Sequence, residues 1–112
     1  MNDRKLLELA AKAAGLEIVN METKDCLAIK TNYCNHDYWN PLTDDGDALR
    51  LVVKLNLFLF HAWTHAEGVP LANVMVQNAE QTVTCGEIKG DNPYAATRRA
   101  IVRAAAEIGK DE

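Results

Sequence analysis

The sequence predicts a single α+β domain, residues 1–112, built as a three-layer α/β/α sandwich. Three segments repeat apolar residues at helical spacing and begin or end at capping residues. Shorter apolar segments between turn residues predict about five strands, and strands joined by short turns pair antiparallel. The run Leu57-Phe58-Leu59-Phe60 is typical of a strand covered on both faces, which favours helices on both sides of the sheet. The predicted order is α-β-β-α-β-β-β-α.

The first helix is predicted over residues 3–14, where apolar and charged residues separate onto two faces. Asn2 or Asp3 can cap its start, and Gly15 can adopt the left-handed conformation that ends it. Residues 16–21 and 26–31 are predicted strands, joined by a hairpin connection at 22–25. Residues 32–40 are polar and lack periodicity, so they predict a loop.

The second helix, residues 44–55, has the most strongly marked start in the chain. Trp39 and Pro41 end the extended segment before it, and Thr43 or Asp44 can cap it. Its first turn is acidic, which the helix dipole favours, through Asp44, Asp45 and Asp47. Leu49 and Val53 widen its predicted buried stripe. Asparagine is a good left-handed cap, so the helix should end at Asn56.

Three further strands are predicted at residues 57–64, 72–77 and 82–87. Pro70 falls outside them, in a predicted turn. The last helix opens at Gly90-Asp91-Asn92-Pro93, with Asp91 or Asn92 as cap and Pro93 at the favoured first position. Tyr94 is predicted on its buried side.

Composition narrows the function classes. The net charge of −4 argues against a dedicated nucleic-acid binder, which usually carries a basic excess. The N-terminus lacks the pattern of a signal peptide, and the longest apolar run is too short to span a bilayer. We therefore expect a soluble cytoplasmic protein without a membrane partner. Cys26, Cys34 and Cys85 show no C-x-x-C spacing and predict reduced thiols, buried in strands except for Cys34.

Two motifs resemble the phage ABA sandwich domain, a family of small tailed-phage and prophage proteins. The motifs are W-N-P-L-T-D-D-G-D-A-L-R-L at residues 39–51 and P-Y-A-A-T-R-R-A-I-V-R-A-A-A-E-I-G at residues 93–109. The resemblance implies an alpha–beta–alpha layered fold and a location in the host cytoplasm. It implies no activity and no catalytic residues, because the family's function is unknown. Residues 32–37 and 58–67 depart from any family pattern.

No candidate metal site has convincing spacing. The acidic run at Asp44 lies in a helix start and lacks the twelve-residue loop of an EF-hand. His61 and His65 on a strand would lie about 13 Å apart, too far for one ion. The cluster of Cys34, His36 and Asp37 has no second ligand group beside it. The sequence therefore predicts no metal, no cofactor and no catalytic residues.

The binding candidates all come from the two motifs: Trp39, Asn40, Asp45, Asp47, Arg98, Arg99 and Arg103. Trp39 is expected to anchor the chain against a helix, or alternatively to form a ligand shelf in a cleft. The acidic helix start and the arginines have opposite charges, which predicts a structural joint between the motifs, with Arg98 reaching Asp45 or Asp47. Spacing on the last helix predicts that an arginine pairs with Glu107.

The leading functional hypothesis is a non-enzymatic phage or prophage accessory protein that contacts an unknown host or phage protein. One alternative is a nucleic-acid-binding accessory protein that uses the last helix, favoured by exposed arginines without acidic neighbours. Another is a small-ligand-binding or enzymatic domain around Trp39, Asp45 and Arg98, favoured by a deep pocket with perturbed carboxylates. Unguarded edge strands also predict a homodimer.

Overall fold

The computed structural model describes residues 2–19, 27–30, 36–66 and 69–110. These residues form three helices and six strands and confirm the α+β class. In chain order the elements are α1 (Asp3–Ala13), β1 (Ile18–Val19), β2 (Leu27–Lys30), β3 (His36–Trp39), α2 (Asp45–Leu55), β4 (Phe58–Ala66), β5 (Val69–Gln77), β6 (Thr84–Ile88) and α3 (Pro93–Lys110).

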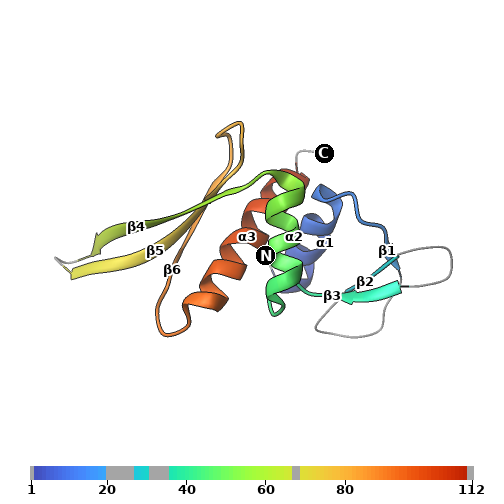
Figure 1. Ribbon diagram of the computed structural model, residues 1–112, viewed down its shortest axis with the longest axis horizontal. Helices are drawn as coiled ribbons and strands as arrows, with labels where there is room; N and C mark the ends of the chain where they lie inside the picture. Colours follow the sequence, from blue (N-terminus) through green and yellow to red (C-terminus); the bar gives the residue numbers. More distant parts are fainter. Residues whose placement is uncertain (1, 20–26, 31–35, 67–68, 111–112) are drawn as a thin grey trace.

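The described strands form two antiparallel three-stranded sheets, with orders β1-β2-β3 and β4-β5-β6. The helices lie between these sheets (Figure 1). One sheet of about five strands, within a three-layer α/β/α sandwich, is therefore not confirmed. Each sheet is a local meander closed by short connections, and α2 separates the two in the chain. Local periodicity predicts strands but does not reveal whether strands on either side of a helix join one sheet.

The strand β3 corrects the predicted loop at residues 32–40. It pairs with β2 in a register that matches Leu27 with Trp39 and Lys30 with His36. A segment with polar residues can form a strand, because pairing with a neighbouring strand matters more than the β-propensity of its own residues. Residues 32–35 of the predicted loop lie outside the described residues, as does the hairpin connection at 22–25.

The position of the strand β4 was predicted correctly, but its burial on both faces was not confirmed. It lies at the edge of its sheet, and Phe58, Phe60 and Trp63 are 56%, 43% and 69% exposed. A run of apolar residues records a preference for burial, whereas actual coverage depends on which element packs there. The prediction for Pro70 is also wrong, because it lies in β5 opposite His65.

The helix boundaries follow the capping residues in the sequence. The Asn2 side chain accepts a hydrogen bond from the Lys5 amide, and the Asp44 side chain accepts one from the Asp47 amide. The Asn92 side chain does the same for the Ala95 amide at the start of α3. Gly15 and Asn56 have φ angles of +73° and +53°, so both predicted left-handed ends are confirmed.

The core is centred on α3, which contacts α1 on one side and the β4–β6 sheet on the other. Many of its buried residues are small, which allows close approach on both sides: Ala100, Ala104, Ala105 and Ala106. Against them lie Leu7 and Ala10 of α1, and Val74, Val76 and Cys85 of the sheet. This cluster holds the helices and the β4–β6 sheet together.

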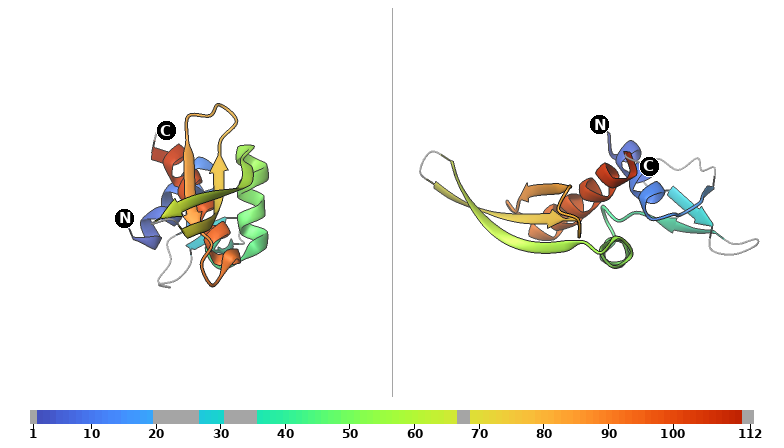
Figure 2. Two further views of the ribbon diagram at one scale, coloured as in Figure 1. Left: turned by 90° about the vertical axis from the view of Figure 1, so that its left-hand side faces the viewer. Right: turned by 90° about the horizontal axis from the view of Figure 1, so that it is seen from above.

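The molecule is elongated, with principal extents of 54 × 30 × 23 Å. Much of the length comes from β4 and β5, which extend away from the helices as a two-stranded arm (Figures 1 and 2). We call the described part of this hairpin, Phe58–Ala66 and Val69–Gln77, the arm. None of the helices described in the structure is both long and apolar enough to cross a membrane.

Candidate functional site

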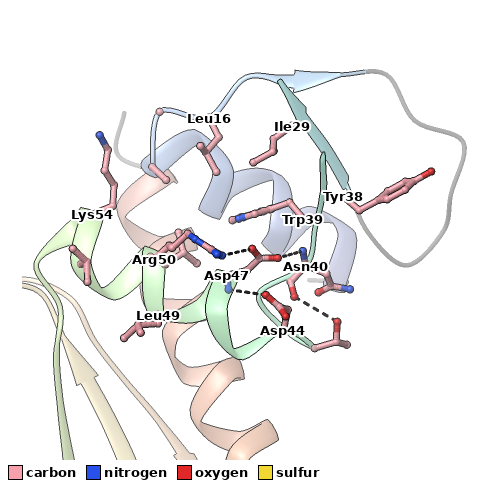
Figure 3. Close-up of a pocket in the computed structure, with 15 residues that line it drawn as sticks. Leu16, Ile29, Tyr38, Trp39, Asn40, Asp44, Asp47, Leu49, Arg50 and Lys54 are labelled. Atoms are coloured by element: carbon pink, nitrogen blue, oxygen red, sulfur yellow. Dashed lines mark hydrogen bonds and ion pairs between the residues drawn. The ribbon is translucent and has the colours of Figure 1, made fainter. Parts of the chain in front are cut away.

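A groove of about 1400 Å³ runs between α2 and the β1–β3 sheet (Figure 3). Part of its lining is apolar: Leu16, Ile29, Tyr38, Trp39, Leu49 and Val53. Another part is polar or charged: Asn40, Asp44, Asp47, Arg50 and Lys54. Apolar walls with a few charged groups are typical of a surface that receives another molecule.

One wall of the groove is held by the Asp47 carboxylate. One oxygen accepts a hydrogen bond from the Asn40 amide at 3.0 Å, and the other pairs with Arg50 at 2.9 Å. The Asp47 side chain is only 15% exposed. Burial raises the pKa of Asp47; the Asn40 amide opposes this shift, nearby Asp44 adds to it, and Arg50 opposes it. Both oxygens of the Asp47 carboxylate are therefore engaged in contacts that hold Asn40 and Arg50 in place.

Trp39 lies in the floor of the groove and is 3% exposed. It belongs to the central apolar cluster, as expected for an anchor. Its neighbour Tyr38 borders the groove, but its ring is 65% exposed and points away from Trp39, to the other side of β3 (Figure 3). The Asn40 side chain then accepts a hydrogen bond from the Leu42 amide at 3.0 Å, which turns the chain toward α2.

The predicted joint between the two motifs is formed by Arg98. Its Nε donates to the Leu42 carbonyl at 2.8 Å, and its Nη1 contacts an Asp45 carboxylate oxygen at 2.7 Å. The Arg98 side chain is 17% exposed, whereas that of Asp45 is 78% exposed. Arg98 therefore ties α3 to the start of α2, and neither residue lines the groove.

Arg99 and Arg103 lie elsewhere on α3. Arg99 contacts Asp3 at 3.1 Å, while Arg103 pairs with Glu87 and donates to the Gly86 carbonyl at 2.9 Å. Both arginines line a smaller cavity of about 330 Å³. The predicted local pairing of an arginine with Glu107 is wrong, because Glu107 pairs with Lys110 and the arginines face carboxylates from α1 and β6. The packing of α3 against α1 and β6 therefore determines which carboxylates Arg99 and Arg103 contact.

The structure therefore separates the predicted binding residues into three places. Trp39, Asn40 and Asp47 lie at the groove, Asp45 and Arg98 at the joint, and the last two arginines beside the smaller cavity. Sequence reasoning placed Leu49 and Val53 in a buried stripe, yet they are 62% and 69% exposed. The prediction that Tyr94 is buried is also wrong, since it is 71% exposed. The apolar stripe of α2 is wider than one packing partner can cover. This width was the signal in the sequence that part of the stripe would be exposed.

Among the described residues, the cysteines and histidines form no cluster that could act as a metal or catalytic centre. Cys85 is a free, buried thiol whose pKa is raised by burial, an effect that Arg103 opposes. Cys26 and Cys34 lie outside the described residues. His61 and His65 lie on β4, as predicted, and the His61 Nδ1 lies 2.7 Å from Lys89 Nζ. Within the described part of the chain, no three His, Cys, Asp or Glu residues are grouped to hold a metal ion. The absence of a metal stays a prediction.

Comparisons with known proteins provide no relative for this chain: no family model matches it, and no curated protein or solved structure is significantly similar. What the structure defines is a small α+β domain with two three-stranded sheets among its described residues. Membership of the phage ABA sandwich family therefore remains a prediction from the two motifs.

Replacing Arg98 with alanine should lower the free energy of unfolding by about 1–3 kcal/mol, the usual cost of removing a charged hydrogen-bond partner from a partly buried group. The Leu42 carbonyl would lose the donor that ties it to α3. Asp45→Ala should stay within about 0.5 kcal/mol, because its carboxylate is largely exposed. Urea denaturation of both variants measures the difference, and equal losses would contradict this account of the joint.

Proposed function

We propose that this protein is a non-enzymatic accessory protein that acts through protein–protein contacts, with the groove beside α2 as its docking site. The resemblance of its two motifs to the phage ABA sandwich domain supports a phage or prophage origin. On that basis the partner is a phage or host protein met in the host cytoplasm. The occupant of the groove is a polypeptide segment that presents apolar side chains.

The observation that carries the proposal is the exposure of apolar side chains on α2 at the groove. Leu49 and Val53 are four residues apart, hence on one face of α2, and are 62% and 69% exposed. Arg50 directly follows Leu49 and Lys54 directly follows Val53, and both charged residues line the same groove. An apolar centre bordered by charged groups resembles the composition of protein interfaces. Exposed apolar patches of this kind commonly mark interaction sites.

The two alternative functions have weaker support. The arginines of α3 have acidic partners, with Arg98 on Asp45, Arg99 on Asp3, and Arg103 on Glu87. This arrangement reduces the positive field available to phosphates. The groove does contain a carboxylate of raised pKa, but Asp47 is already bonded through both oxygens. Its contacts therefore favour a structural role over a reacting one.

A photo-crosslinking experiment tests the docking site. p-Benzoylphenylalanine would replace Val53 at the groove or, as a control, Tyr94 on α3, a comparably exposed position that does not line the groove. Illumination in host cells should join the Val53 variant to a defined polypeptide, identified by mass spectrometry. Adding Leu49→Asp should remove this adduct, because a charge would enter the apolar contact.

The same polypeptide adducts from both positions, or adducts that survive Leu49→Asp, would contradict a specific docking site. Native mass spectrometry of the protein purified from those cells distinguishes the ligand-binding alternative. An added small-molecule mass that disappears in Leu49→Asp would replace the protein-contact proposal with that alternative.

A further inference from the structure

The strand β4 presents a long edge of the β4–β6 sheet. Among the described strands it pairs with β5 alone, along nine residues from Phe58 to Ala66. Its sequence, FLFHAWTHA, contains no lysine, arginine, aspartate, glutamate or proline. Natural edge strands commonly carry such residues to prevent pairing with another chain. This edge is not protected in that way.

Apolar side chains occupy both faces of the sheet along this edge. The register places Leu59, opposite Val76, on the face that α3 covers, while Phe60 lies on the outer face opposite Met75. Alternation places Phe58 on the outer face and Trp63 on the helix-side face. These four side chains are between 40% and 69% exposed, so α3 does not cover the edge on its own side.

We infer that two copies of the chain pair through β4, antiparallel about a twofold axis, to form one continuous six-stranded sheet. Edge pairing explains why apolar residues occur on both faces of the sheet. Stacking of two outer faces would cover the apolar residues of only one face. The far part of the arm extends beyond the helices (Figure 2), and Phe58, Leu59, Phe60 and Trp63 of β4 are exposed. An identical strand needs no complementary charge, consistent with the uncharged sequence of β4.

The exposed aromatic side chains of β4 supply part of the area that a stable dimer interface needs. With about 150–250 Å² per aromatic side chain, the exposed parts of Phe58, Phe60 and Trp63 offer roughly 250–420 Å² in each copy. A stable interface buries about 800 Å² per partner. The aromatic residues alone thus supply up to about half, before Leu59 and the strand backbone are counted. This inference does not rest on the proposed function, because no residue of β4 lines the groove.

Sedimentation equilibrium of the full chain tests the pairing. We expect a mass twice the 12.4 kDa of one chain across micromolar concentrations. Phe60→Glu on the outer face and Trp63→Glu on the helix-side face should each raise the dissociation constant by at least about tenfold. Tyr94→Glu is the control, because Tyr94 is at least as exposed as Phe60 and Trp63 but lies on α3. Circular dichroism verifies that each variant is folded.

Amide hydrogen exchange of the unmodified protein provides a second measurement that needs no variant. Amides of β4 that point away from β5 should become protected as protein concentration rises. A monomer at every concentration, or no concentration-dependent protection in β4, would overturn the inference. Dissociation by Phe60→Glu alone would indicate stacked outer faces, and dissociation by neither variant would place the interface elsewhere. Either result would also overturn edge pairing.

Discussion

Replacing Trp39 with alanine should lower the free energy of unfolding by about 3–5 kcal/mol, the usual cost of deleting a large buried aromatic side chain. Trp39 is 3% exposed and ends β3, the strand that leads into α2. Its removal would leave a cavity in the central cluster that also contains Leu51. Chemical denaturation followed by circular dichroism measures the loss without depending on tryptophan fluorescence.

The adjacent aromatic residue provides the control. Tyr38 lies on the opposite face of β3 and is 65% exposed, so Tyr38→Ala should change the free energy of unfolding by less than about 1 kcal/mol. A Trp39→Ala protein as stable as the unmodified chain would contradict the anchor role. It would support a ligand shelf if the variant had also lost a bound small molecule. The two substitutions therefore separate a structural tryptophan from a binding one.

The features that the sequence predicted well depend on short-range chemistry. Asn2, Asp44 and Asn92 cap their helices, and Gly15 and Asn56 end theirs, because each acts on backbone groups a few residues away. The division of the strands into two sheets depends instead on contacts between distant segments. Periodicity contains no information on that choice. The strand β3 was missed for another reason: its segment is polar and without periodicity, and pairing with β2 forms it.

The candidate site shows the same division. Opposite charges predicted that Arg98 would reach the start of α2, and the contact with Asp45 is present. Helical spacing suggested a local partner for the other arginines, yet Arg103 pairs with Glu87 of β6. Leu49 and Val53 were expected to be buried because apolar patterning identifies residues that favour burial, but does not show what covers them. The width of this apolar stripe was a sign that part of it would stay exposed, but it did not show which residues those would be.

Gly109→Ala should destabilise the protein by about 1–3 kcal/mol or more, the cost of forcing an extra methyl group into a packed site. Gly109 is buried in α3 where this helix crosses α1. A β-carbon there would lie 2.9 Å from the Leu9 carbonyl carbon and closer still to its oxygen. These are backbone atoms of α1, so relief of the clash requires the two helices to move apart.

Gly46→Ala is the matched substitution, a glycine in the first turn of α2. Its new β-carbon would meet the Arg50 guanidinium at 3.3 Å and the Asp44 carboxylate at 3.4 Å, and the Arg50 side chain can shift. Alanine favours the helix over glycine by up to about 1 kcal/mol, so Gly46→Ala should be neutral or stabilising. The same chemical change should therefore lower the thermal midpoint at Gly109 and leave it unchanged or raise it at Gly46. If Gly109→Ala stabilised the protein as well, α1 and α3 could not approach as closely as the structure shows.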